Sequence, residues 1–272
     1  MVIKKKSRLE NARNAFEKKD ISATKLAHTK GAIKRHFHNE DTISEREKYV
    51  SEFIYGAVDG TVTTFAVVAG ATGAALDPVV VIILGFANLI ADGFSMACGN
   101  FLSEKTQIDY IKRERNREEW EIENAREGEV EEVREIYRKK GFKGKDLDRA
   151  VTIITSDKKT WLDTMMADEL GLLESPKSPL LTAAATFVGF VTIGIIPLSA
   201  YLLATFVPFF SQNTFAIACL LTFFGLIIVG IIKSQVNRTS ILRSTIETVF
   251  IGGAAAVLAY LVGYLLRFIV GV

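Results

Sequence analysis

Four side chains that could handle a metal ion lie in two apolar segments, each long enough to cross a bilayer. Asp59 lies in the first segment, and Asn88, Asp92 and Met96 lie in the second at i, i+4 and i+8. At about 3.6 residues per turn, that spacing places the last three on one stripe of a helix. A charge at mid-bilayer costs at least about 2.5–3.5 kcal/mol on insertion scales, so such residues are usually functional. Carboxylate and amide oxygens with one thioether suit a divalent transition metal better than Mg²⁺ or Ca²⁺, which indicates an ion path between helices.

A second group of candidate ligands lies in the charged block that follows. Its glutamates include pairs at i and i+3, a spacing that puts both members on one helical face. Inward-facing glutamates from several helices bind divalent metals in helical bundles. The chain lacks the Glu-x-x-His pairs of di-iron sites, which favours reversible binding over redox chemistry. The candidates are Glu118, Glu121, Glu129, Glu132, Met165, Met166 and Glu169.

Each group also has a purely structural explanation. A segment this acidic is commonly a solvated helix face with Glu–Arg pairs, and composition alone favours that interpretation. Met165 and Met166 could fill gaps in a core. In the membrane segments, one aspartate could lie near the interface and Asn88 could hydrogen-bond a neighbouring helix, but the polar residues there favour the ion path.

The elements that position these residues follow from the apolar runs. Of 272 residues, 49% are hydrophobic and 24% are charged, but the apolar residues are concentrated in long runs. Two runs lie within residues 49–103, and three more cover about 180–208, 214–232 and 248–271. A bilayer core of about 30 Å takes roughly 20 helical residues. The sequence therefore predicts an all-α membrane protein with five transmembrane helices, of which helices 1 and 2 form the pore.

The polar parts predict the domains and their orientation. Residues 1–48 carry 13 Lys/Arg against 7 Asp/Glu and lack the apolar core of a secretory signal, so we expect a flexible or surface-lying cytoplasmic arm. Residues 104–178 form a cytoplasmic helical domain inserted between helices 2 and 3, and residues 179–272 form helices 3 to 5, leaving the C-terminus outside or in a lumen. The second span continues into the inserted domain, because no helix breaker occurs between Leu102, where the apolar pattern ends, and Gly128.

Several motifs, in this order, resemble those of the vacuolar iron transporter family. They are GAVDGTVTTFAVVAG in the first span, DGFSMACGNFLSEK in the second, the glutamate block, and WLDTMMADELGL after it. The resemblance runs from about Tyr49 to the C-terminus and does not cover the arm. Members of the family export cytosolic Fe²⁺, and often Mn²⁺, into a vacuole or out of the cell in exchange for protons. The resemblance implies a homodimer of five-span protomers, a pore between the first spans of the two subunits, and a cytoplasmic domain that captures metal.

The resemblance also implies roles for single residues. The family's pore aspartate and methionine match Asp59 and Met96. Where eukaryotic vacuolar members carry a glutamate eight residues before that methionine, this chain has Asn88 and places Asp92 one turn later. Asn88 can offer an oxygen to a metal but cannot carry a proton, so either Asp92 does the acid's work or the coupling differs. The family's capture site matches Glu118, Glu121, Glu129, Glu132, Met165, Met166 and Glu169.

The expected function is transport of Fe²⁺ or Mn²⁺ out of the cytosol, with Zn²⁺ and Co²⁺ as further candidates. A membrane-bound metal buffer or sensor without translocation is the alternative. We expect no enzymatic activity and no prosthetic group, because the sequence shows no nucleotide loop, no nucleophile with a base and no cofactor fingerprint. No basic stripe with interleaved aromatics indicates nucleic acid. Metal ions, protons, lipid and a second copy are the expected partners, in a prokaryotic plasma membrane at least as readily as in a vacuolar one.

Overall fold

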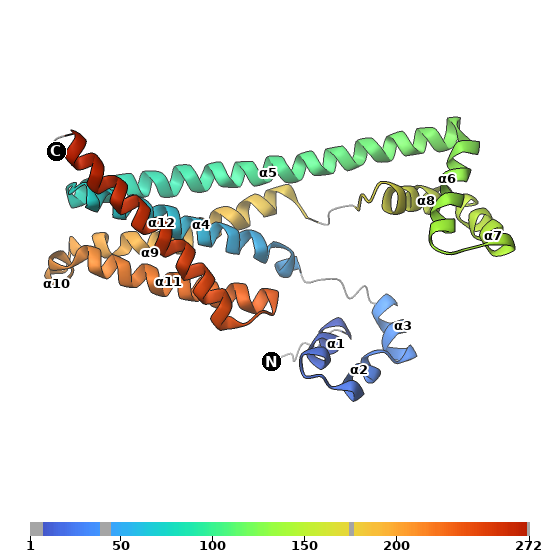
Figure 1. The fold of residues 1–272 in the computed structure, drawn as a ribbon, viewed down its shortest axis with the longest axis horizontal. Helices are drawn as coiled ribbons and strands as arrows, with labels where there is room; N and C mark the ends of the chain where they lie inside the picture. Colours follow the sequence, from blue (N-terminus) through green and yellow to red (C-terminus); the bar gives the residue numbers. More distant parts are fainter. Residues whose placement is uncertain (1–7, 39–44, 174–176, 271–272) are drawn as a thin grey trace. The chain divides into compact units, whose positions relative to one another are not determined.

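The computed structural model describes residues 8–38, 45–173 and 177–270. The chain divides into two compact units, Met1–Lys48 and Tyr49–Val272, which are described separately here (Figure 1). All regular secondary structure in the described residues is helical, which confirms the predicted all-α class.

The first unit contains three short helices, α1 (Arg8–Glu17), α2 (Ile21–Ala27) and α3 (Lys30–His38). The carboxylate of Asp20 caps α2 by accepting a hydrogen bond of 3.0 Å from the Ala23 amide. The Arg8 Nε donates to the Ala27 carbonyl at 3.0 Å and so ties α1 to the end of α2. Composition alone indicates a flexible arm or one short helix, and the structure differs because this cap and the buried Ala15 and Ala27 allow short helices to pack.

Five helices of the second unit are long and apolar enough to cross a membrane, which confirms the predicted number of spans. The third predicted run extended to residue 208, but the helix ends at Ala204 and a short helix, α10 (Pro208–Gln212), follows. The five long helices are α4 (Glu45–Gly73), α5 (Pro78–Asn124), α9 (Pro179–Ala204), α11 (Thr214–Asn237) and α12 (Ile241–Val270).

Helix α5 is a single rod of 47 residues. It begins with Pro78 after a turn in which Asp77 accepts a hydrogen bond of 2.8 Å from the Val79 amide, an N-terminal cap. At 1.5 Å per residue it is about 70 Å long, more than twice the thickness of a bilayer core, so roughly its second half lies outside the membrane. The predicted rod is therefore confirmed, but it ends at Asn124, and Gly128 lies inside the next helix.

Small residues bring the membrane helices close together. A Cβ added to Gly189 of α9 would lie 2.1 Å from the Phe53 carbonyl oxygen of α4, so only glycine permits this approach. The Asn100 side chain of α5 donates a 2.7 Å hydrogen bond to Thr186 Oγ1 of α9. These contacts pack α9 against both helices that carry the predicted pore residues.

Four short helical segments follow α5 and form a small core with its outer half. Asp163 pairs with Arg115 at 2.7 Å and Lys158 with Glu119 at 2.7 Å, which holds α8 against α5. The core is apolar and includes Ile122, Val133 and Trp161. The segments are α6 (Arg126–Lys139), α7 (Gly144–Thr155), α8 (Lys158–Thr164) and the π-helical η1 (Met165–Glu169).

Candidate metal centres

The reversal between α5 and α6 builds a cluster of glutamates. The Ala125 amide donates to the Glu121 carbonyl at 2.7 Å, and this tight turn places the start of α6 beside the end of α5. One carboxylate oxygen from each of Glu118, Glu121 and Glu129 lies within 4.8 Å of the other two. That spacing is small enough for three oxygens to share one cation. The charges of Glu132 and Glu169 also act on the cluster, so the structure brings all five predicted glutamates together.

Two of these carboxylates are almost fully buried. Glu118 is 1% exposed and Glu129 is 5% exposed. Within the described residues, the Oε2 atom of each has no hydrogen-bond partner. A buried carboxylate oxygen without a hydrogen-bond partner is costly, so it favours taking up either a proton or a cation. The geometry therefore distinguishes this cluster from a solvated acidic helix face.

Burial and mutual repulsion keep Glu118 and Glu129 partly protonated near neutral pH. Burial raises the pKa of Glu118 to about 7, and the charge of Glu169 adds to the rise. Burial also raises the pKa of Glu129 to about 7, with Glu132 as the next largest cause. The pKa of Glu169 is raised as well, by burial and then by Glu132. Because the groups interact, they titrate as one coupled site in which protons and a divalent cation compete for the same oxygens.

Arg117 is part of this site, although the sequence analysis missed it. Its Nη2 atom lies 2.6 Å from Glu118 Oε1, its Nη1 atom pairs with Glu121, and its Nε atom lies 3.0 Å from Glu114 Oε2. One guanidinium therefore contacts two of the predicted ligands and one carboxylate outside the predicted set. The sequence offers no signal for this role, because the segment RERNREE interleaves arginine and glutamate throughout.

The predicted methionines lie in the apolar core of the same domain. Met165 and Met166 are 0% and 3% exposed and belong to the core that contains Trp161. Their surroundings match the gap-filling interpretation, and a ligand role for them stays a proposal. Both belong to η1, whose π-helical turn ends at Glu169. π-Helical turns are rare overall, but those that do occur frequently lie at functional sites.

The second predicted group lies inside the membrane helices. Asp59 on α4 and the three predicted residues of α5 are all half-buried within the single chain. The carboxylates of Asp59 and Asp92 are close enough to interact electrostatically. The Nδ2 atom of Asn88 is buried, and in the described part of the chain it donates no hydrogen bond. The alternative in which this amide nitrogen bonds a neighbouring helix therefore has no support among the described residues.

Helix α5 carries parts of both groups. Met96 and Glu118 lie 22 residues apart on it, which at 1.5 Å per residue corresponds to about 33 Å.

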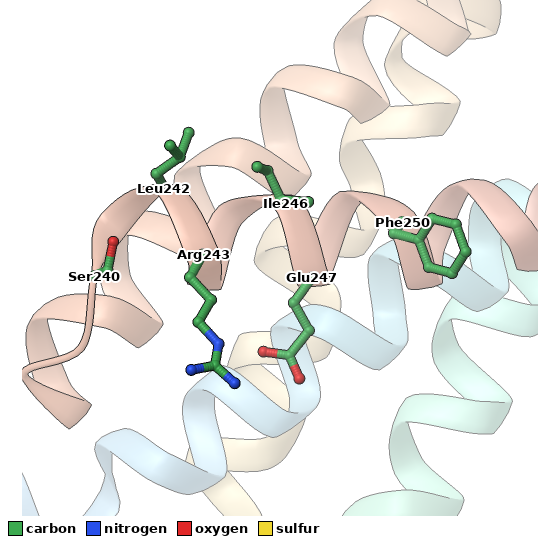
Figure 2. Close-up of a pocket in the computed structure, with 6 residues that line it drawn as sticks. All are labelled: Ser240, Leu242, Arg243, Ile246, Glu247 and Phe250. Carbon is green, nitrogen blue, oxygen red and sulfur yellow. The ribbon is translucent and has the colours of Figure 1, made fainter.

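A separate groove lies at the start of α12, and Figure 2 shows its side chains projecting from that helix and the turn before it. Glu247 in this groove pairs with Lys233 at 3.1 Å. None of the predicted site residues lines the groove.

These features define the class of the protein. It is a multi-pass, all-α membrane protein in which a helical segment between the second and third candidate spans gathers glutamates that can hold a divalent cation. The chain belongs to the VIT family, whose sequence profile matches residues 50–264. This confirms the resemblance drawn from the motifs.

Similar proteins carry related names. The chain is 35% identical over 272 aligned residues to the vacuolar iron transporter of Toxoplasma gondii, covering 97% of this chain and 90% of the relative. It is 35% identical over 274 residues to that of Plasmodium berghei, covering 96% and 97%. Vacuolar iron transporter 1 of Arabidopsis thaliana is 34% identical over 212 residues, covering 78% and 83%. The first two alignments extend into residues 1–48, so the similarity is wider than the expected start near Tyr49.

Proposed function

We propose that this protein exports Fe²⁺ or Mn²⁺ from the cytosol across a membrane in exchange for protons. The observation that carries the proposal is the glutamate cluster, in which two buried carboxylates each keep an oxygen without a hydrogen-bond partner. Membership of the VIT family, relatives named vacuolar iron transporter, and five helices able to cross a membrane support the transport step. Oxygen ligands with two methionines in the same domain suit a divalent transition metal, so Zn²⁺ and Co²⁺ are further candidate ions.

The first step is capture on the cytosolic side. Glu118, Glu121 and Glu129 supply oxygens at distances that allow them to share one ion. Glu132 and Glu169 add negative charge that attracts it, and Met165 and Met166 are candidate soft ligands if the η1 turn opens toward the cluster. Binding displaces protons from Glu118 and Glu129, because both carboxyls have a pKa of about 7.

The second step is passage through the membrane helices. The ion moves along α5 to Met96, and then to oxygens of Asp92, Asn88 and Asp59. In the proposed homodimer, the first spans of two copies face each other across the pore, so aspartates from both copies contribute. Protons and metal compete for the same carboxylates, which gives exchange a physical basis. Asn88 cannot carry a proton, and Asp92 is therefore the proposed proton carrier of α5.

The proposed orientation follows the distribution of basic residues. Residues 1–48 and the domain of residues 104–178 lie in the cytosol, and the C-terminus lies outside or in a lumen. The host membrane is a plasma membrane in a prokaryote or a vacuolar membrane in a eukaryote.

The test is Fe²⁺ uptake into sealed proteoliposomes that contain a metal indicator and a pH-sensitive dye. We expect metal to enter and lumenal protons to leave with the unchanged protein. Asp59→Asn should abolish uptake, and Asp92→Asn should remove the pH change. Asp109→Asn is the matched control, because Asp109 lies on α5 but is exposed and outside both groups.

Each alternative gives a different result. Normal uptake by Asp59→Asn would show that the pore assignment is wrong. Uptake without any pH change in the unchanged protein would leave a uniporter and refute exchange. If the purified protein binds Fe²⁺ but no metal enters the vesicles, the protein is a buffer or sensor.

A further inference from the structure

The Arg117 guanidinium occupies the position of a cation within the glutamate cluster. It contacts Glu118 at 2.6 Å and also pairs with Glu121, and both belong to the group of three whose oxygens lie within 4.8 Å of one another. Its side chain is 42% exposed, so it enters the cluster from the solvent side while Glu118 is buried. An arginine keeps its charge at any pH at which a protein is folded. The contact is therefore a fixed positive charge placed on two proposed metal ligands.

The cluster needs such a charge when no metal is bound. Five carboxylates act on one another there, and their mutual repulsion is one cause of the raised pKa values of Glu118 and Glu129. One guanidinium compensates part of this charge. It leaves both carboxylate oxygens of Glu118 and the Oε2 atom of Glu129 without hydrogen-bond partners in the described residues, so the compensation is incomplete. A divalent cation carries twice the charge and can reach those oxygens.

We infer that Arg117 is a resident counter-cation of the glutamate site, which competes with the incoming metal ion for Glu118 and Glu121. This inference rests on the proposed function, because it concerns the same capture site. The competition keeps the metal affinity low enough for release. The ion must displace an existing ion pair when it enters, and Arg117 takes the place of the ion again when it leaves.

Glu114 holds the guanidinium after it is displaced. Its Oε2 atom already lies 3.0 Å from Arg117 Nε, its side chain is 14% exposed, and it lies one turn before Glu118 on α5. Glu114 is outside the group of three that can share a cation. Arg117 can thus give up Glu118 and Glu121 while keeping one carboxylate partner. A lysine, with one ammonium in place of the branched guanidinium, cannot bridge three carboxylates in this way.

The experiment is anaerobic calorimetric titration of the purified full-length protein with Fe²⁺ at fixed pH and ionic strength. Arg117→Gln should bind Fe²⁺ roughly tenfold more tightly than the unchanged protein, because the ion pairs with Glu118 and Glu121 no longer have to be broken. Arg117→Lys should lie between the two. Arg113→Gln is the matched control: Arg113 is on the same helix, is 75% exposed, and contacts Glu114 at 3.0 Å without touching the cluster. It should change the affinity by less than about twofold.

A double-mutant cycle tests the role of Glu114. Glu114→Gln should weaken Fe²⁺ binding in the presence of Arg117, because the displaced guanidinium then lacks its remaining partner. In the Arg117→Gln background the same change should have a smaller effect. The increase in melting temperature on adding Fe²⁺ should be larger for Arg117→Gln than for the unchanged protein, which gives a second measurement of the same competition.

The outcomes separate this inference from the proposed function. If the unchanged protein binds Fe²⁺ and Arg117→Gln binds it equally or more weakly, Arg117 only holds the glutamates in place and the inference is wrong, while the capture site stands. If neither protein binds Fe²⁺, the proposed capture site fails together with the inference. Tighter binding by Arg117→Gln, with Arg113→Gln unchanged, supports the inference.

Discussion

At the scale of single residues, the proposed capture site predicts that protons and metal ions compete for Glu118 and Glu129. Both carboxyls have a pKa raised to about 7, mainly by burial, so each must lose a proton before it can bind metal near neutral pH. We expect Fe²⁺ affinity to fall by roughly a hundredfold between pH 8 and pH 6 if both are ligands. Titrations in two buffers with different ionisation enthalpies measure the protons released. A pH-independent affinity over this range would contradict the assignment.

The same burial makes the metal-free protein less stable at high pH. The pKa of Glu118 is about 7 in the folded protein, against 4.5 as its ordinary value. The folded state therefore binds this proton more tightly, and the resulting stability is complete below about pH 4.5 and is lost as the pH rises through 7. Glu118→Gln should raise the free energy of unfolding at pH 8 by up to about 3 kcal/mol and change it little at pH 5.

Thermal melts in the presence of a chelator at both pH values check this expectation. Glu127→Gln is the control, because Glu127 is exposed in the first turn of α6. An equal effect of Glu118→Gln at pH 5 and pH 8 would show that its carboxyl does not titrate in this range.

At the scale of helices, the contact between α4 and α9 depends on glycine. A Cβ on Gly189 would lie 2.1 Å from the Phe53 carbonyl oxygen, and a backbone atom cannot move aside as a side chain can. Gly189→Ala should therefore push the two helices apart and cost at least about 2 kcal/mol of stability. Gly253→Ala on α12 meets nothing within 4 Å and should be neutral or slightly stabilising, since alanine favours helix. Melting temperatures in one detergent compare the two, and equal values would contradict the close approach.

The membrane helices were predictable from the sequence because their length is set by the bilayer. Apolar runs of at least about 20 residues have few alternatives to a spanning helix. Helix ends were less predictable. Gly128 is the first helix breaker after the second span, yet α5 ends at Asn124 and Gly128 lies in the first turns of α6. The reversal is fixed by packing of Ile122 and Val133 in a common core rather than by a breaker.

The candidate site was predictable only in part. The i, i+3 spacing places Glu118 with Glu121 on one helical face, but it does not say which faces meet, and only the family resemblance brought the glutamates of α5 and α6 together. The π-helical turn that begins at Met165 has no sequence signal. A π-turn holds one residue more than an α-turn, and packing rather than local sequence decides where it forms. Arg117 was missed because α5 carries many arginines and glutamates at spacings that allow ion pairs. The sequence does not show which of these arginines lies at the glutamate cluster.

At the scale of the whole second unit, two connections join the glutamate domain to the membrane helices. One is α5 itself, which is continuous from Pro78 to Asn124. The other is the return to α9, where Lys177 Nζ lies 2.5 Å from Glu52 Oε1 of α4 and the Ser178 amide donates to the Tyr49 hydroxyl at 2.9 Å. The segment that leads into α9 is therefore attached to α4, and α5 runs without a break from the membrane helices into the domain.

The ion pair of the second connection should matter more for transport than for metal capture. Glu52 is 14% exposed and Lys177 is 29% exposed, so removing either side chain takes a charged contact away from a partly buried group. Lys177→Gln and Glu52→Gln should each lower the melting temperature, and their double-mutant cycle should give a coupling of about 1 kcal/mol. Fe²⁺ affinity should not change, because the three glutamates close enough to share an ion lie on α5 and α6 and do not contact this ion pair.

Transport measurements on charge-exchanged variants test whether the Lys177–Glu52 ion pair links metal capture to the pore. We expect Fe²⁺ uptake by proteoliposomes to slow in Lys177→Glu and in Glu52→Lys, since each places like charges together beside α4. The double exchange restores opposite charges, and uptake should recover in part. If both single variants transport at the normal rate while their melting temperatures fall, the ion pair stabilises the fold without linking capture to the pore. If the double variant is as slow as the singles, the position of each charge matters rather than their attraction.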